Sequence, residues 1–160
     1  MNAIGNGDHA TVVREIIRLT WLDRPPLGTF IAVGDNQDRR KEALASPGPF
    51  PVLIHPSAIV SESATIEGGS VIMAGAIIQP HAHIGWHVIV NTGATVDHHC
   101  EVGDFAHIAP GAHLCGRVLV GEGALVGVGV GIEPGTIIPA WSIVKRIPYA
   151  IEPVSGHAAA

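Results

Sequence analysis

Aliphatic residues recur at every sixth position along most of the chain. Cut into hexads from Leu53, the sequence carries Ile, Val or Leu at the second place of sixteen consecutive units, from Ile54 to Val144. The sixth place is always Ala, Ser, Thr, Cys or Val, and places three to five are rich in Gly, Pro, Ser, Asn and Asp. Places six, one and two therefore alternate inward, outward and inward as in a β-strand, while the other places are typical of turns.

This repeat predicts a solenoid. Each hexad supplies one short strand and one corner, so three hexads close a coil of eighteen residues, and about five coils stack as a triangular prism. The second-place residues fill the axis, and each fully buried Val or Ile contributes roughly 1.5–3 kcal/mol. We therefore expect a mainly β fold, a parallel β-helix of hexapeptide repeats, over residues 51–146, followed by a C-terminal tail at 147–160.

Residues 1–50 do not follow the repeat. In "AIGNGDHATVVREIIRLT" the aliphatic residues at 12, 13, 16 and 17 share one helical face, which predicts a helix after a glycine-rich turn. Such a turn presents N–H groups to a phosphate. "TFIAVGDNQDRR" predicts a strand that ends at Asp35 and Asn36. Because the first strand is short and no second strand is evident before Thr29, we expect a small, shortened α/β nucleotide-binding domain.

Composition and charge exclude several classes of protein. With 47% hydrophobic residues, 14% charged residues and 20 glycines, the chain is too apolar for disorder and too glycine-rich for a helical bundle. The net charge is −5 and no Lys or Arg lies between Glu42 and Gly116, so this span cannot follow a nucleic-acid backbone. The most apolar run is interrupted by Glu133, prolines and glycines, which argues against a membrane span. Two cysteines and an opening without a signal peptide predict a cytoplasmic protein.

Histidines gather in the middle of the repeat, and their places in the hexad decide where they point. His98 and His99 occupy places four and five, so both project outward from a corner. Residues eighteen apart stack on neighbouring coils about 4.8 Å apart, which puts His98 beside Gly116 and His99 between His81 and Arg117. We expect these neighbours to favour the neutral form of His99.

The outward first-place residues sort onto three faces. One face is aliphatic except for a single histidine: Leu53, Val71, Ile89, His107, Leu125 and Ile143. An exposed apolar patch of this size is not expected on a monomer, so we expect this face to pack against other copies in a closed homotrimer. His98 and His107 would then border the cleft between subunits. Another face is mixed and is expected to meet water: Thr65, His83, Glu101, Leu119 and Ile137.

The segment "NTGATVDHHCEVGDFAHIAPGAHLCG" resembles the signature of the NeuD/PglD family, the sialic-acid O-acetyltransferases and UDP-4-amino-sugar N-acetyltransferases. The matching elements are Asn91-Thr92, an acid followed by histidine and cysteine within 97–100, Gly103-Asp104-Phe105, His107 and Pro110. "FPVLIHPSAIVSESATI" is similar to the entry to the family's prism. The resemblance implies that the β-helix is left-handed and that the chain is an acetyl-CoA-dependent acetyltransferase with direct transfer.

In this family one histidine is the general base and a later histidine contacts acetyl-CoA. Carried onto this sequence, the resemblance implies that His98 is the base and that His107 contacts acetyl-CoA. Gly116, Val128 and Arg146 are further candidate contacts with acetyl-CoA; the cation of Arg146 either attracts the CoA phosphates or is simply solvated. A positioned imidazole that removes a proton from an attacking amine or hydroxyl is typically worth 10²–10⁴-fold in rate. Cys100 occupies an inward sixth place and is therefore a poor nucleophile candidate.

The family usually has an acid directly after the base, whereas this chain has His99. A carboxylate that orients His98 must then come from Asp97, Asp104 or another subunit. His99 itself is a further candidate for tuning or orienting the base.

The beginning of the chain also resembles the family, whose members hold the nucleotide of a sugar substrate there. The resemblance implies substrate contacts at five residues: Gly7, Asp8, His9, Asp35 and Asn36. We therefore expect N-acetylation of a nucleotide-linked amino sugar in surface glycan biosynthesis, without a metal. Sugar O-acetylation uses the same base and is the close alternative. A zinc enzyme of the same fold is a further alternative, although no His-x4-His pair occurs, and a silent scaffold is another.

Overall fold

The structure of this protein is a computed structural model, and it describes residues 2–5, 7–20 and 27–145. Arg146, expected to contact acetyl-CoA, and the tail at 147–160 lie outside the described residues.

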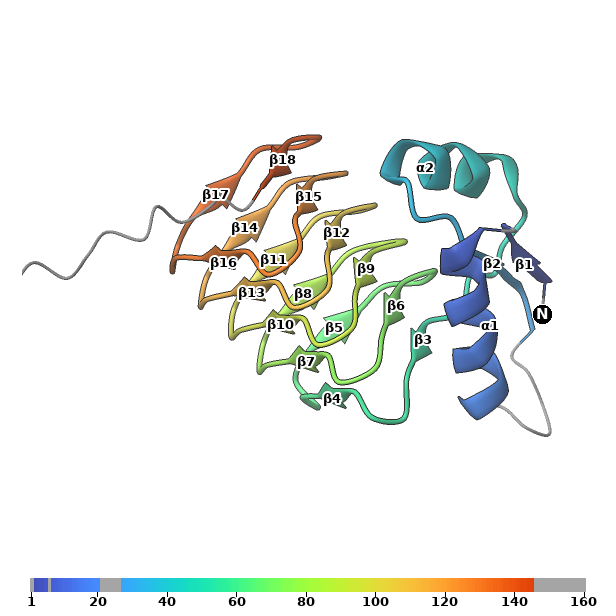
Figure 1. The fold of residues 1–160 in the computed structure, drawn as a ribbon, viewed down its shortest axis with the longest axis horizontal. Coiled ribbons are helices and arrows are strands. Elements are labelled where there is room, and N and C mark those ends of the chain that lie inside the picture. Colours follow the sequence, from blue (N-terminus) through green and yellow to red (C-terminus); the bar gives the residue numbers. More distant parts are fainter. Residues whose placement is uncertain (1, 6, 21–26, 146–160) are drawn as a thin grey trace, which may run out of the picture.

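Sixteen two-residue strands follow one another at six-residue intervals and form three parallel sheets (Figure 1). Sheet I contains β3 (Leu53–Ile54), β6 (Val71–Ile72), β9 (Ile89–Val90), β12 (His107–Ile108), β15 (Leu125–Val126) and β18 (Ile143–Val144). Sheet II contains β4 (Ile59–Val60), β7 (Ile77–Ile78), β10 (Thr95–Val96), β13 (His113–Leu114) and β16 (Gly131–Ile132). Sheet III contains β5 (Thr65–Ile66), β8 (His83–Ile84), β11 (Glu101–Val102), β14 (Leu119–Val120) and β17 (Ile137–Ile138).

The register of these sheets confirms the predicted coil. Each strand pairs in parallel with the strands eighteen residues away; Val96, for example, lies opposite Ile78 and Leu114. The chain passes from sheet I to sheet II to sheet III in every coil, so the corners are named I/II, II/III and III/I. About five coils stack in this way, and the parallel β-solenoid is confirmed.

The second-place and sixth-place side chains form the axis of the prism, as predicted. They belong to one cluster of buried residues, in which Val96 and Ile108 have no exposed surface. Three sixth-place residues carry a hydroxyl, and Ser70 is the fully buried one: its hydroxyl donates to the Gly85 carbonyl (2.7 Å) and accepts from the Val88 N–H (2.9 Å). The axis tolerates this hydroxyl because both of its hydrogen-bonding roles are satisfied.

The corners share one backbone conformation. From Gly69 to Trp141, every fifth-place residue has a φ between 54° and 74°. Glycine occupies seven of these thirteen places, and the other six are His81, His87, His99, Phe105, Arg117 and Trp141. Left-handed backbone is strained for residues with a Cβ, and the packing of the surrounding coils holds these six residues in it.

The N-terminal segment contains β1 (Asn2–Ile4), α1 (Asp8–Thr20), β2 (Thr29–Ile31) and α2 (Asn36–Ala45). The helix predicted after the glycine-rich turn is confirmed, and so is the start of a strand at Thr29, although the strand ends at Ile31 and not at Asp35 and Asn36. β1 pairs in parallel with β2. α2 begins directly after Asp35, whose Oδ1 accepts from the N–H groups of Gln37 and Asp38 (both 2.9 Å) as an N-cap. Within the described residues, no helix combines the length and apolar character needed to cross a membrane.

The N-terminal segment lies against sheet I (Figure 1), which corrects the prediction that this face packs against other copies. Three of its first-place residues are buried within the chain itself: Leu53, Val71 and Ile89. They share a buried cluster with Val13 and Ile16 of α1. The aliphatic face of the helix and the aliphatic face of the sheet cover one another, so no second copy is needed there. The C-terminal end of sheet I, which we call its upper part, stays open: Ile143 of β18 is 60% exposed.

Candidate functional site

His98 lies at the II/III corner between β10 and β11 and is half-buried. Its backbone N–H donates to Asp97 Oδ1 (2.7 Å), which holds the corner in shape. The ring lies over Gly116 on the next coil, where a Cβ atom would come within 2.5 Å of His98 Cε1. The predicted stacking of these two residues is therefore confirmed, and the missing side chain at 116 makes room for the imidazole.

The ring of His98 has the neighbouring imidazole as its hydrogen-bond partner. The Nδ1 atoms of His98 and His99 are 3.1 Å apart, and the two rings meet edge to face at 82°. One nitrogen must donate and the other accept. When His98 donates from Nδ1, its Nε2 keeps the lone pair that a general base requires.

His99 has the neighbours predicted for it, His81 and Arg117. Its ring centroid lies 5.0 Å from that of His81. The pKa of His99 is lowered, first by partial desolvation and then by the charges of His81, Arg117 and His98. The expectation that His99 favours its neutral form is confirmed, although desolvation and not charge is the first cause.

The carboxylates expected near His98 are engaged elsewhere. Asp97 accepts from the backbone of His98 and not from its ring. Asp104 lies at a III/I corner, where its Oδ1 accepts from the Trp86 N–H (2.8 Å). The prediction that Asp104 orients His98 is therefore wrong within one chain, because the two residues occupy different edges of the prism.

His107 projects outward from β12 and is half-buried under the N-terminal segment. Its Nε2 is 3.0 Å from the Asn91 amide nitrogen. Because the amide donates, Nε2 accepts and the ring proton is on Nδ1. Burial, followed by the charge of Arg39 and the neighbouring His9, lowers the pKa of His107 to about 3, so this ring is neutral at physiological pH.

Arg39 of α2 holds the N-terminal segment against the prism, a role that the sequence does not predict. Its guanidinium is 1% exposed and donates to backbone carbonyls on both sides of the junction, including those of Gly34 (3.0 Å), His87 (2.8 Å) and Phe105 (2.6 Å). Burial lowers the pKa of Arg39 to about 10, partly offset by Asp35, so the group stays charged. No signal in the sequence distinguishes Arg39 from the adjacent exposed Arg40.

Two of the expected substrate residues, His9 and Asp35, lie at the same edge of the N-terminal sheet, because the carboxyl ends of the parallel strands β1 and β2 meet there. His9 packs against Gly34, and burial, followed by the charge of Arg39, lowers its pKa to about 4. Its Nε2 has no hydrogen-bond partner among the described residues. Asp35 is exposed at the start of α2.

The other expected substrate residues have more structural roles. The Asn36 amide nitrogen donates to the Gly123 carbonyl (3.0 Å) and so ties α2 to the prism. The Gly7 carbonyl accepts from the Ala10 N–H (3.0 Å) at the start of α1, and Asp8 is exposed in that first turn.

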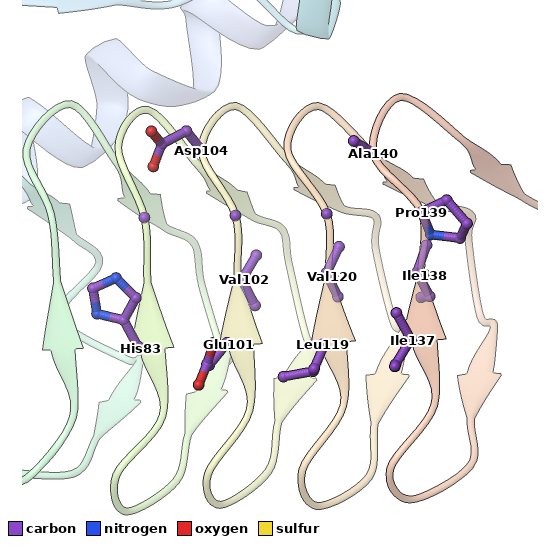
Figure 2. Close-up of a pocket in the computed structure, with 13 residues that line it drawn as sticks. His83, Glu101, Val102, Asp104, Leu119, Val120, Ile137, Ile138, Pro139 and Ala140 are labelled. Carbon is purple, nitrogen blue, oxygen red and sulfur yellow. The ribbon is translucent and has the colours of Figure 1, made fainter.

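A pocket of about 160 Å³ lies where the loop before α2 meets the upper part of sheet I. It is lined by residues 34–37 on one side and by His107, Leu125, Trp141 and Ile143 on the other. A wider depression of about 350 Å³ follows sheet III, past His83, Glu101, Leu119 and Ile137 (Figure 2). Neither His98 nor His107 lines the wider depression, so the smaller pocket is the better candidate for chemistry.

One chain does not bring His98 and His107 together. His98 is at the II/III corner, the edge of the triangular prism opposite sheet I, from which His107 projects. Gly116 lies at the same edge as His98, whereas Val128, 66% exposed, lies at a I/II corner. The expected acetyl-CoA contacts are therefore divided between different sides of one chain. Within the described residues, no three His, Cys, Asp or Glu side chains are grouped as a metal site.

No protein-family model matches the chain, but solved structures do. It is similar to the acetyltransferase domain of PglB from Neisseria gonorrhoeae FA1090 in complex with acetyl coenzyme A, with 35% identity over 89% of this chain and 85% of that chain and a TM-score of 0.82. It is also similar to PerB from Caulobacter crescentus in complex with CoA and GDP-perosamine, with 35% identity over 90% of this chain and 87% of that chain and a TM-score of 0.75.

Proposed function

Because the chain belongs to the hexapeptide-repeat acetyltransferases of the PglD/NeuD type, we propose that it transfers the acetyl group of acetyl-CoA to the amine of a nucleotide-linked amino sugar in surface glycan biosynthesis. The observation that carries this function is the 35% identity, over most of both chains, to structures that hold acetyl-CoA in one case and CoA with GDP-perosamine in the other. In keeping with the family, the solenoid is left-handed and residues 1–50 bind the sugar nucleotide.

The reaction needs a base for the amine. The amine nitrogen attacks the thioester carbonyl carbon, the N–C bond forms, and the C–S bond breaks as the CoA sulfur leaves. His98 Nε2 takes the proton from the attacking nitrogen, a contribution typically worth 10²–10⁴-fold. The protonated imidazole can return that proton to the leaving sulfur, so no covalent enzyme intermediate is required.

His99 takes the place of the acid that usually follows the base in this family. A carboxylate would accept from His98 Nδ1–H, and the His99 Nδ1 lone pair, 3.1 Å away, supports the same arrangement. The lowered pKa of His99 keeps that lone pair available. The imidazole pair thus holds His98 in the tautomer whose Nε2 is the base.

We further propose that the complete site lies between subunits of a homotrimer. Support comes from the positions of His98 and His107 on opposite sides of one prism, which only a neighbouring copy can bring together. The open upper part of sheet I, with Ile143 60% exposed, and sheet III, with Ile137 70% exposed, offer apolar surface for that contact. In this arrangement His107 of one chain contacts the acetyl-CoA used by His98 of the next.

The test is acetyl transfer by the purified protein, measured as release of free CoA thiol with a panel of nucleotide-linked amino sugars. We expect turnover by the wild type and a 10²–10⁴-fold lower kcat in His98→Ala. His113→Ala removes an exposed histidine from sheet II and should retain activity within about twofold. Transfer to hydroxyl sugars alone would favour the O-acetyltransferase alternative, and stoichiometric zinc would favour the metal enzyme. If the protein transfers acetyl to none of these acceptors, the catalytically silent scaffold is the interpretation that remains.

A further inference from the structure

Trp141 occupies a place where the backbone favours glycine. It is the fifth-place residue of the last III/I corner, with a φ of 58°. The two other bulky residues of that column, His87 and Phe105, are buried and stack on each other beneath the N-terminal segment. Trp141 is 39% exposed, so burial does not compensate for its strained backbone. A different role is needed to explain a large aromatic ring there.

The indole of Trp141 packs on a defined surface. It lies over Gly123 on the preceding coil, where a Cβ atom would come within 2.3 Å of the indole. The Asn36 side chain donates to the Gly123 carbonyl (3.0 Å), so α2 is bonded to the backbone beneath the ring. The Arg40 guanidinium carbon lies over the indole ring, 6.0 Å from its centroid, and Arg40 Nε bonds to Glu122 (3.2 Å). These contacts fix the orientation of the indole.

Two depressions meet at this indole. The pocket of about 160 Å³ reaches His107, and a second depression of about 260 Å³ is lined by Gln37, Arg40 and Trp141. Gln37 and Trp141 line both, so the two depressions adjoin at these residues. We call the two together the groove, with His107 in one part and Arg40 in the other. The groove has the parts that a nucleotide needs: an aromatic face for a base, an amide for its polar edge and a guanidinium at the end.

We propose that Trp141 is the stacking platform for the nucleobase of the acceptor, with Gln37 hydrogen-bonding to the edge of the base. The base lies in the depression of about 260 Å³ that Arg40 lines, and the amino sugar extends into the pocket of about 160 Å³ toward His107. This proposal rests on the nucleotide-linked acceptor of the proposed function and adds the residues that recognise its base. Stacking tolerates any base, so Trp141 sets affinity for a nucleotide over a free sugar.

Fluorescence tests the platform without turnover. The chain has three tryptophans, so the Trp21→Phe/Trp86→Phe variant keeps Trp141 as its single indole. We expect saturable quenching of this variant by GDP and by UDP, and none by pyrophosphate, which carries the same phosphates without a base. Quenching by pyrophosphate equal to that by GDP, or no quenching by either nucleotide, would overturn the proposal.

Kinetics provide the second arm. Trp141→Gly removes the ring and suits the φ of 58°, so the corner should be retained, which thermal melting verifies. We expect its KM for the nucleotide-linked acceptor to rise about tenfold or more with little change in kcat, and Trp141→Phe to recover most of the loss. Trp86→Phe, at an exposed corner outside the groove, is the matched control and should keep the wild-type KM.

The two proposals fail in different ways. Quenching by nucleotides without acetyl transfer by the wild type would support the platform and contradict the proposed function. Acetyl transfer that requires His98 but keeps an unchanged KM in Trp141→Gly would contradict the platform and leave the function in place.

Discussion

The Nδ1 atoms of His98 and His99 lie 3.1 Å apart at the corner between β10 and β11. This contact is local in sequence, yet it depends on the left-handed backbone at His99, whose φ is 59°. In that conformation the two adjacent side chains turn toward each other instead of alternating. The corner therefore converts a pair of sequence neighbours into a hydrogen-bonded pair, in which one imidazole can select the tautomer of the other.

Removal of the His99 ring should reduce the rate and not the binding of substrates. Glycine accepts a φ of 59°, so His99→Gly removes the imidazole without straining the corner. We expect kcat to fall about tenfold, the equivalent of one lost hydrogen bond, while both KM values stay unchanged. His99→Glu supplies an acceptor again and should recover part of the loss. Steady-state kinetics on the same acceptor measure both.

His81→Gly is the matched control, because His81 has a φ of 61° and lies directly below His99 in the same column. It should lower kcat far less than His99→Gly does, because desolvation, and not the charge of His81, is the first cause of the lowered pKa of His99. An unchanged kcat in His99→Gly would show that His98 needs no partner within the chain.

The protein should lose stability as the pH falls from about 6.5 to about 4. Burial, followed by the charge of Arg39 and partly offset by Asp104, lowers the pKa of His87 to about 4 in the folded state, against 6.5 in the unfolded chain. The unfolded chain therefore binds more protons in this window, and the cost of keeping His87 neutral grows as the pH falls. His9 and His107, with pKa values of about 4 and about 3, add to the same trend.

His87→Phe should weaken this dependence. The ring is 4% exposed, stacks on Phe105 at an interplanar angle of 3°, and its Nδ1 has no partner among the described residues. A phenyl ring fills the same space without a proton-binding nitrogen. We therefore expect the free energy of unfolding of the wild type to fall by about 2 kcal/mol more than that of His87→Phe between pH 7.5 and pH 5. Chemical denaturation at both pH values measures it. A wild-type stability that is the same at pH 5 and pH 7.5 would contradict the assignment.

Replacement of Arg39 should release the N-terminal segment while the prism stays folded. Arg39→Met leaves backbone carbonyls of both parts without a donor, including those of His87 and Phe105, at a cost of about 3 kcal/mol. We expect amide hydrogen exchange in α1 and α2 to accelerate about a hundredfold, while the amides of the central coils exchange as before. Lys41→Met removes an exposed cation from the same helix and should change neither. Equal protection of α2 in both variants would refute the clamp.

An acid in the axis should unfold the prism. Val96 has no exposed surface, and its neighbours in the column are Ile78 and Leu114. Val96→Asp places a carboxylate without a partner among aliphatic side chains, and we expect the free energy of unfolding to fall by about 4 kcal/mol or more. Thr95→Asp adds the same group one residue earlier, on the outer face of the same strand, and should stay within about 1 kcal/mol of the wild type. Thermal melting compares the pair; a cooperatively melting Val96→Asp protein would contradict the register.

The sequence predicted the solenoid residue by residue because its repeat is local. With a period of six and a small residue before each outward position, the aliphatic second-place residues can be buried together only along the axis of the prism. The coil length of eighteen residues then decides which residues stack on one another. The positions of His98 over Gly116 and of His99 against His81 follow from that arithmetic, and the structure confirms both. Asp104, one of the carboxylates considered for His98, lies at a different edge, as its fourth place in a hexad that joins sheet III to sheet I already implies.

What covers the aliphatic face of sheet I could not be predicted in this way. Periodicity placed Leu53, Val71 and Ile89 outward, but only the folded chain shows that its own first helix buries them. Residues 1–50 have no repeat, so their docking depends on complementary surfaces that meet through the path of the whole chain. Arg39 shows the same limit, since a cation inside a polar helix becomes a buried clamp only when carbonyls from two distant segments converge on it.

The sequence by itself determined the prism, its axis and the edge from which His98 projects, because each of these follows from contacts at a constant spacing along the chain. Only the tertiary structure decided which face the N-terminal segment occupies, that His107 lies beneath it, and that Trp141 borders the same groove. Those relationships join residues that no repeat connects, and the packing free energy of the two surfaces selects them.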